Sequence, residues 1–372
     1  MDPTGVEPAS RVCQVRHVTV TPRARGAFTR RTDYTTKKNS VRVPFADTRF
    51  CPWLEHAVFN ESVSEVKMFV NLLYPHSMRL ALVHDYLSQD GGAERVLSAF
   101  HELWPAAPIF VLFHDKNKLS QFAEADVRES MIAKLPFGRT KYQWYLPLMP
   151  LATERHNLHE FDVVLSSTSA FAKGVLTRPE TLHISYCHTP TRYLWTDTHE
   201  YIADLKYNLI IKAALPRLIH RLRLWDKMSA DRVDHFIANS DTVRGRIAKY
   251  YRRDSDIIHP PVDTDKFAVA PEVGDYYITG GRLVPYKRLD LVVHVFNRLR
   301  WPLKIFGDGP ELSALKDRSR DNIEFVGRVS DEEKARLLAR AKAFVHPQVE
   351  DLGITPVESM ASGRPVIAYG AG

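Results

Sequence analysis

The stretch that decides the fold is MRLALVHDYLSQDGGAERVLSAFHELW, residues 78–104. It starts with an apolar run, passes through a polar turn that contains Gly91 and Gly92, and ends in an amphipathic segment. The apolar side chains of that segment recur at helical spacing and share one face: Val96, Leu97, Phe100, Leu103 and Trp104. A buried strand, a glycine turn and a helix in this order form the repeating unit of a parallel α/β sheet.

This unit recurs in two series. Four further apolar runs, each ending in polar or turn residues, belong to the first series: 107–114, 161–167, 181–188 and 234–240. A helix over 207–233 is expected to break near Pro216, because proline removes a backbone donor. The double proline at 260–261 ends the first series, and the second contains five runs: 276–282, 303–309, 323–329, 343–348 and 365–370. We therefore predict an α/β protein with two Rossmann-like, doubly wound domains that face a cleft, spanning residues 78–262 and 263–372.

Residues 1–77 differ from the rest, with scattered Arg, Pro and Thr and no sustained period. We expect this extension to be poorly structured, apart from a weak helix within 53–74. Met78 opens the first strand, so our hypothesis is that the natural protein begins there. N-terminal sequencing of the natural product would decide it.

The chain has 372 residues, 44% of them hydrophobic and 26% charged, which is ordinary for globular proteins and long enough for two domains. It contains no run of about 18 apolar residues, and no apolar signal region at the N-terminus. The three cysteines, Cys13, Cys51 and Cys187, have no paired spacing. We expect neither a disulfide framework nor a zinc site, and a cytoplasmic location.

The formal charge of +7 is unevenly distributed, because residues 205–253 hold twelve Lys and Arg against four Asp. Such a surplus suits phosphates, an anionic membrane surface or nucleic acid, and it also suits a solvated helical face. Apolar residues interleave with these cations: Leu209, Ile210, Ile211, Leu215, Leu218, Leu222 and Trp225. That mixture favours peripheral binding to anionic lipid.

Cations and glycines follow several predicted strands. Arg282 lies just beyond a strand end and Lys287 shortly before a helix. The planar guanidinium of an arginine and the compact ammonium of a lysine together suit a diphosphate. Gly91 and Gly92 would let backbone N–H groups approach an anion at a helix N-terminus, although a plain tight turn explains them equally well. The turn that contains Gly307 and Asp308 has both a structural and a ligand-contacting interpretation.

Two acids stand near the end of the chain, in EDLGITPVE, residues 350–358. Glu350 is expected in a loop after a strand. Pro356, with Thr355 as cap, predicts a helix start that places Glu358 in the first turn. The two carboxylates suit hydroxyl groups of a sugar and a ribose; a general acid–base pair and capping of the helix dipole are the alternatives. His188 ends a first-series strand, where a ligand-contacting and a structural histidine are equally expected.

Seven motifs in series resemble the family 4 glycosyltransferases of GT-B architecture: HDYLSQDGGAERV, AFAKGVLTRPETLHISYCHTPTRYLW, DHFIANS, HPPVDTDKF, GGRLVPYKR, FGDGPEL and EDLGITPVESMASGRPVIAYG. Their order from Leu80 to Gly372 matches that family throughout. The first-series motifs most resemble bacterial enzymes of polysaccharide and O-antigen assembly, often mannosyltransferases.

The resemblance implies retaining, metal-independent transfer without a cofactor, from a nucleotide-diphosphate sugar, with GDP-mannose favoured, to a glycan or lipid-linked acceptor. Peripheral binding through 205–253 at the inner face of the plasma membrane would fit a lipid-linked acceptor, and we expect no nucleic-acid partner. By this resemblance the catalytic residues are His188, Glu350, Arg282 and Lys287. The donor-binding residues are Gly91, Gly92, Arg282, Lys287, Gly307, Asp308, Glu350, Gly353, Ile354 and Glu358. Glu350 would bind the donor sugar, Glu358 the ribose, and the Arg and Lys the diphosphate.

Two departures accompany the resemblance. Leu352 stands where the family more often has Phe or Tyr, and family members continue past Gly372. We therefore expect a truncated second domain, reduced stability and impaired activity. A nucleotide-sugar epimerase of the same architecture and an inactive membrane-binding fragment are the alternatives. A dehydrogenase is disfavoured because no GxGxxG follows either first strand.

Overall fold

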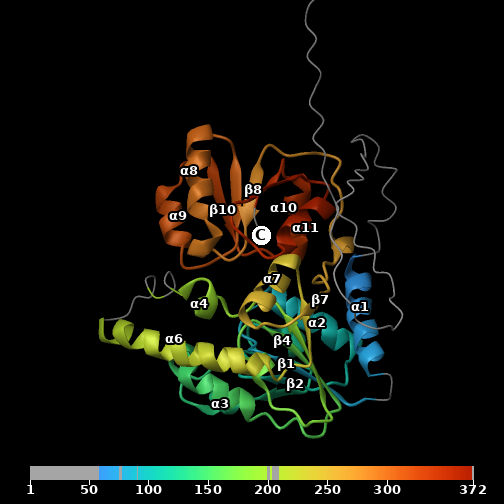
Figure 1. The fold of residues 1–372 in the computed structure, drawn as a ribbon. Helices are drawn as coiled ribbons and strands as arrows, with labels where there is room; N and C mark the ends of the chain where they lie inside the picture. The colour runs from blue at the N-terminus through green and yellow to red at the C-terminus, as the bar shows by residue number, and fades with distance from the viewer. Residues whose placement is uncertain (1–57, 75–77, 90, 199–201, 203–208, 371–372) are drawn as a thin grey trace, which may run out of the picture. The chain divides into compact units, whose positions relative to one another are not determined.

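The computed structural model describes residues 58–74, 78–89, 91–198, 202 and 209–370, and they contain two parallel sheets (Figure 1). The first has the order β3-β2-β1-β4-β5-β6-β7 and the second β10-β9-β8-β11-β12. The first comprises β1 (Leu80–His84), β2 (Ile109–Val111), β3 (Val127–Glu129), β4 (Val163–Thr168), β5 (Leu182–Cys187), β6 (His235–Ala238) and β7 (Ser255–Ile257). The second comprises β8 (Tyr277–Gly280), β9 (Leu303–Phe306), β10 (Ile323–Gly327), β11 (Phe344–His346) and β12 (Val366–Ala368). The predicted α/β class with two doubly wound sheets is confirmed.

Helices connect these strands. Those of the first part are α1 (Val58–Leu73), α2 (Gly92–Leu103), α3 (Met149–Glu154), α4 (Arg192–Trp195), α6 (Leu209–Ala230) and α7 (Asp241–Tyr250). Those of the second part are α8 (Leu289–Leu299), α9 (Leu312–Arg318), α10 (Asp331–Arg340) and α11 (Ile354–Ala361). Since parallel strands need such crossovers, helices cover both sheets, and central strands such as β1 are buried on both faces.

Each sheet reverses its strand order at one point. In the first sheet β1 pairs with both β2 and β4, and in the second β8 pairs with both β9 and β11. The loops after the two strands at a reversal leave in opposite directions, which opens a crevice at the strands' carboxyl ends. The predicted site residues lie mainly in loops that follow such strands.

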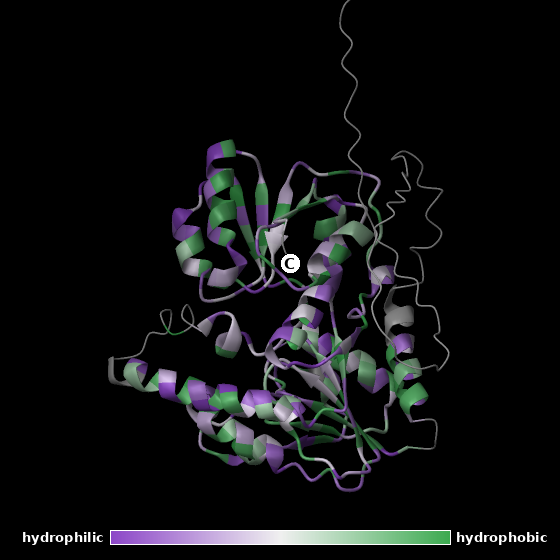
Figure 2. Ribbon diagram, viewed as in Figure 1, coloured by the Kyte–Doolittle hydropathy of each residue, from purple (hydrophilic) through white to green (hydrophobic). Residues whose placement is uncertain are grey.

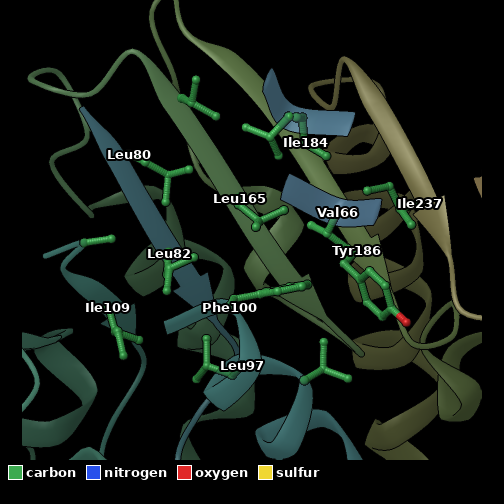
Figure 3. Close-up of a cluster of buried hydrophobic side chains, with 14 of the residues drawn as sticks. Val66, Leu80, Leu82, Leu97, Phe100, Ile109, Leu165, Ile184, Tyr186 and Ile237 are labelled. Atoms are coloured by element: carbon green, nitrogen blue, oxygen red, sulfur yellow. The ribbon is translucent and has the colours of Figure 1, made fainter. Parts of the chain in front are cut away.

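The core of the first sheet joins strands and helices distant in sequence. Figure 3 shows Leu82 of β1, Leu165 of β4 and Ile184 of β5 with Phe100 of α2, all of them buried. The ring of Phe100 meets that of Tyr186 edge-on, with centroids 5.5 Å apart. The helical face predicted for α2 therefore faces the sheet.

Helix α1 bears on the expectation for residues 1–77. It forms within the stretch predicted as a weak helix, and its Val66 and Val70 are 2% and 0% exposed in the same core cluster. The helix predicted within 53–74 is therefore confirmed over residues 58–73, and it packs on the core of the first sheet. Residues 1–57 lie outside the described residues, and a natural start at Met78 remains a prediction.

Two local predictions were wrong. Helix α6 runs unbroken through Pro216, and this proline is exposed, so the carbonyl that it leaves unpaired can meet water. The edge strand β3 was missed because Val127 and Glu129 are only half-buried and give no apolar run.

Asp85 ties the first sheet together at its reversal. Its carboxylate follows β1, is 6% exposed, and accepts four backbone N–H groups from the loop after β4. These donors lie at 2.7, 2.9, 2.7 and 2.7 Å: Ser169, Ala170, Phe171 and Ala172. Charge-assisted hydrogen bonds of this kind are roughly twice as strong as neutral ones.

We predict that Asp85→Ala lowers the free energy of unfolding by on the order of 3 kcal/mol, because it leaves buried N–H donors without an acceptor. Asp85→Asn, which keeps one acceptor oxygen, should lose less. Urea denaturation followed by circular dichroism measures both. Asp321→Ala, which removes a 91% exposed partner of Arg300, is the control and should change stability by less than about 1 kcal/mol. Equal effects of Asp85→Ala and this control would contradict the prediction.

Candidate functional site

Glu350 and Lys287 meet at the reversal of the second sheet. Lys287 ends the short helix η6 (Pro285–Lys287) after β8, and Glu350 lies in the loop after the neighbouring strand β11. Lys287 Nζ is 3.6 Å from Glu350 Oε1, while His346 Nε2 and Gln348 Nε2 lie 3.1 and 3.0 Å from Oε2. Burial disfavours the charged form of Glu350. The hydrogen bond from His346 and the charge of Lys287 outweigh burial and lower the pKa of Glu350 to about 2. Glu350 is therefore an ionised acceptor and has no proton to give as a general acid near neutral pH.

Glu358 differs from its predicted setting. Helix α11 begins at Ile354 with Gly353 as N-cap, so Glu358 lies in the second turn, not the first, and Thr355 is not the cap. The side chain is buried, and its Oε1 accepts from Arg95 Nη1 at 2.9 Å and Lys334 Nζ at 2.8 Å. Its Oε2 is buried without a hydrogen-bond partner. Capping of the helix dipole therefore does not account for Glu358; it is a fixed acid with one oxygen left over.

The N-termini of α2 and α11 adjoin. Their N-caps, Gly91 and Gly353, provide no side-chain cap to the first N–H groups. A Cβ added to Gly92 would lie 3.0 Å from Ile354 Cδ1, so the two first turns are in close contact. Helix N-termini carry partial positive charge and free backbone donors, and two together favour an anion between them.

Arg282 reaches the same region from the second sheet. Its exposed guanidinium donates from Nη1 to Gln89 Oε1 at 2.9 Å, two residues before Gly91. The predicted diphosphate cations thus take different positions. Lys287 pairs with Glu350, whereas Arg282 borders the glycine turn of α2.

Gly307 and Asp308 lie in the turn after β9 and contact the loop after β8, which contains the GGR motif at 280–282. Gly307 has φ of +106°, and a Cβ there would lie 1.8 Å from the carbonyl oxygen of Gly281. The exposed Asp308 accepts from the N–H of Gly309 at 2.8 Å, and its carbonyl accepts from Leu283 N at 2.9 Å. The contacts support the structural interpretation of both residues, since each holds the loop that carries Arg282.

His188 is fixed to the end of β5 in the first sheet. Its Nε2 is 2.8 Å from Ser167 Oγ, which is 3.1 Å from His84 Nδ1. Burial, and secondarily the neighbouring His84, lower the pKa of His188 to about 3, so the ring is neutral at pH 7. No described contact joins its ring to Glu350 or Lys287.

The sequence interpretation missed an ion pair that links the loops of these two residues. Arg246 of α7 donates to Thr189, the residue after His188, at 2.8 Å, and to Asp351, the residue after Glu350, at 2.6 Å. Burial raises the pKa of Asp351 despite the opposing charge of Arg246. Arg95, which holds Glu358, was missed as well. No local pattern reveals these pairs, because the partners lie 105 and 263 residues apart.

Part of the apolar face predicted for a membrane surface at 205–253 lies in the core, while Leu224 and Met228 of the same helix are exposed. Leu222 is buried, and Leu218 and Trp225 pack against the same core cluster, so these apolar side chains face inward. Four of the cations form ion pairs with acids of the same chain: Lys227 with Asp231, Arg232 with Glu154, Arg244 with Asp241 and Arg246 with Asp351. Helix α6 alternates between hydrophobic and hydrophilic residues along its length (Figure 2).

Other features of the described residues bear on the function. None of their helices is long and apolar enough to cross a bilayer. Within the same residues, no group of three or more His, Cys, Asp or Glu is placed to hold a metal ion. A hollow of about 950 Å³ is lined by the segment 266–276, Lys304 and α10, and none of the predicted site residues borders it.

Two family models match the chain: Glycosyltransferase Family 4 over residues 90–266 and Glycosyl transferases group 1 over residues 263–372. The O-antigen chain mannosyltransferase RfbU of Salmonella typhimurium is 30% identical over 160 residues, 38% of this chain and 43% of the relative. The alpha-monoglucosyldiacylglycerol synthase of Streptococcus pneumoniae is 25% identical over 250 residues, 59% of this chain and 54% of the relative. The chain thus spans about half the length of these curated relatives.

Among solved structures, Anabaena Alr3699/HepE in complex with UDP-glucose matches with a TM-score of 0.56 and 17% identity. The match covers 80% of this chain and 81% of that one. Sucrose-phosphate synthase from Thermosynechococcus elongatus matches with a TM-score of 0.55 and 15% identity, over 79% and 81% of the two chains. These structures share the GT-B fold with this chain.

We predict that Gly307→Ala destabilises the protein by on the order of 3 kcal/mol, because the new methyl group collides with a backbone carbonyl at a positive φ. Gly327→Ala is the matched control, since Gly327 has φ of +74° but open space around its Cβ position. It should cost only about 1 kcal/mol. Urea midpoints measure both changes. Equal losses would show that backbone conformation alone, without the collision, explains the glycine.

The lowered pKa of Glu350 predicts a pH dependence. Its folded pKa lies below the ordinary value of 4.5, so its ionised form stabilises the protein above that pH and the contribution is lost as the pH falls toward 2. Glu350→Gln should therefore be less stable than the natural chain at pH 7, and the gap should narrow toward pH 3. Urea titrations across this range test it, with the exposed Glu324→Gln as control. A gap that is constant with pH would contradict the assignment.

Proposed function

This chain belongs to the family 4 glycosyltransferases, and we propose that it transfers a hexose with retention from a nucleotide-diphosphate sugar to a glycan or lipid-linked acceptor. The observation that carries the proposal is the meeting of Glu350 with Lys287 at the β8/β11 reversal. A crevice at such a reversal is where open parallel sheets bind ligands. The acid and the cation provide opposite halves of a site for a sugar joined to a diphosphate.

The diphosphate would lie against the cations and the free helix ends. Lys287 and Arg282 flank the loop after β8, and the uncapped N–H groups of α2 and α11 adjoin nearby. Negative charge grows on the leaving nucleotide diphosphate as the sugar departs. Donors fixed beforehand stabilise that charge more in the transition state than in the ground state, which is the condition for catalysis.

The two acids would bind hydroxyl groups. Glu350 is ionised, so it accepts hydrogen bonds from the hydroxyls of the donor sugar. Glu358 is held by Arg95 and Lys334 through Oε1, and its buried Oε2 needs a donor. A ribose hydroxyl would satisfy that oxygen, since a buried acceptor without a partner is costly. His188, neutral and anchored through Ser167, would contact the reacting sugar as a hydrogen-bonding group.

Mannose is the proposed donor sugar and GDP the proposed nucleotide. Two curated relatives carry names that support it: the O-antigen chain mannosyltransferase and a GDP-mannose-dependent phosphatidylinositol monomannoside mannosyltransferase of Mycolicibacterium smegmatis, 30% identical over 35% of this chain and 42% of its own length. The second name, together with that of the alpha-monoglucosyldiacylglycerol synthase, supports a lipid-linked acceptor. Such an acceptor would fit a peripheral position of this chain at the inner membrane face.

We predict that GDP raises the melting temperature and GDP-mannose raises it further, because a ligand that binds only the native state stabilises it by mass action. Glu350→Ala should abolish the increment that the mannose adds and leave the shift by GDP. Lys287→Ala and Arg282→Ala should reduce the melting-temperature shifts by GDP and by GDP-mannose more than the shift by GMP, which lacks the second phosphate. Arg288→Ala removes a charge from the same loop, where the side chain bonds Asp290, and should change neither shift.

The outcomes separate the parts of the proposal. If UDP compounds shift the melting temperature and GDP compounds do not, the base is wrong while the glycosyltransferase assignment stands. If no nucleotide diphosphate shifts it, the donor site is wrong. Conversion of the donor's sugar without an acceptor would favour an epimerase. Proton NMR of the transferred sugar reports the anomeric configuration, and inversion would contradict the retaining mechanism.

A further inference from the structure

We propose that the chain binds anionic phospholipid bilayers through a surface formed by Phe137, Lys141, Trp144, Leu148 and Leu151, here called the aromatic–basic surface. These residues lie on the helical segments η3 (Tyr142–Leu148) and α3 and on the turn before them. The inference rests on the peripheral membrane position in the proposed function and deepens it by naming the surface that makes the contact; binding to a bilayer requires no nucleotide. It places the membrane contact away from the region 205–253.

Large apolar side chains are concentrated on this surface. Phe137 is 61% exposed, Trp144 59%, Leu151 47% and Leu148 38%. Trp144 and Leu148 lie on the 3-10 helix η3, and Leu151 lies in α3, which follows it directly. Isolated exposed apolar residues are ordinary on soluble proteins, but a contiguous set marks an interaction site.

The charge of the segment identifies the partner. Between Glu129 and Glu154 the segment contains Lys134, Arg139 and Lys141 and no Asp or Glu; Arg139 pairs with Glu129, so Lys134 and Lys141 carry its positive charge. A segment with apolar side chains, cations and no acids is complementary to an anionic lipid surface, where each cation near the headgroups contributes roughly 1 kcal/mol.

Lys141 and the two aromatic rings form one unit. Lys141 Nζ lies 4.6 Å from the centroid of the Trp144 ring and 5.4 Å from that of Phe137, and the rings meet edge-on at 6.3 Å. This arrangement places a cation directly beside two exposed rings. Aromatic rings prefer the interface between headgroups and acyl chains, and an adjacent ammonium can pair there with a lipid phosphate.

Phe137 has an unusual backbone for an exposed phenylalanine. Its φ is +56°, in the left-handed region that costs roughly 1 kcal/mol for a side chain with a Cβ. Its carbonyl accepts N–H bonds from Thr140 and Lys141 at 3.0 and 2.7 Å, which hold the turn closed. A ring that is presented to solvent at such a cost is typical of a functional position.

The surface rests on the same end of the first sheet as the candidate site. Tyr142 of η3 packs on Tyr86 and Phe113, with ring centroids 5.1 and 4.8 Å away, and Tyr86 follows Asp85 at the end of β1. Met149 at the start of α3 is buried in the same cluster. An acceptor held in a bilayer at this surface would therefore lie close to the carboxyl ends of the strands.

The test measures binding of the full chain to vesicles of phosphatidylcholine alone or with phosphatidylglycerol, by flotation without nucleotide. We expect binding that depends on the anionic lipid, and at least about a tenfold loss in Phe137→Ser/Trp144→Ser and in Lys141→Glu. Arg217→Glu/Arg221→Glu, which reverses two exposed cations of α6, is the matched control and should retain most of the binding. Thermal melting shows that each variant is folded.

Several results would overturn the inference. The natural chain could ignore anionic vesicles, or the α6 variant could lose binding while the aromatic variants keep it. A third contradicting result is that the aromatic variants keep their vesicle binding but lose affinity for a soluble glycan. The surface would then bind the acceptor sugar. Brominated lipids give an independent readout: they should quench the tryptophan fluorescence of the natural chain more than that of Trp144→Phe, and equal quenching would contradict the assigned contact. None of these results depends on the donor site, so they leave the proposed function to its own experiment.

Discussion

The four N–H groups that converge on Asp85 are the constraint on which the first sheet depends. The strand order reverses between β1 and β4, so the loops after these strands diverge and their backbone groups lose the partners a continuing strand would give. One buried carboxylate satisfies four of these donors at once and fixes the loop after β4 to the end of β1. The loop leads to Lys173, whose ammonium pairs with the fully buried Asp226 at 2.5 Å.

Asp226 extends this constraint toward the candidate site. Besides Lys173 it accepts hydrogen bonds from Thr191, Trp195 and Tyr251, so the segment after β5 is held at both ends of α4. A buried ion pair is stable only when its remaining lone pairs are satisfied in this way. His188 stands at the start of that segment, and its position therefore depends on carboxylates far from it in the sequence.

The sequence predicted the strands well because parallel strands buried on both faces are short apolar runs with sharp polar ends. Ten of the twelve strands in the described residues coincide with such runs, while the edge strands β3, with half-buried Val127 and Glu129, and β7, with half-buried Ser255 and Ile257, have none. The meeting of Glu350 with Lys287 was accessible in outline, since both follow strands of one series. Their adjacency required the strand order, which puts β11 beside β8. The bonds from Arg95 to Glu358 and from Arg246 to Asp351 were not accessible, because pairwise contacts across hundreds of residues leave no local pattern.

The wrong placement of Glu358 has a specific physical reason. Proline is common in the first turn of a helix, so Pro356 and Thr355 suggested a start three residues before Glu358. Gly353, with φ of +81°, instead lets the helix begin at Ile354 and moves Glu358 into the second turn, beneath α10 and beside Arg95. There the two cations hold the acid in place, and a buried oxygen is left without a donor. Folding thus tolerates an unsatisfied acceptor that a ligand hydroxyl would satisfy, and this supports a role for Glu358 in binding beyond its role in packing.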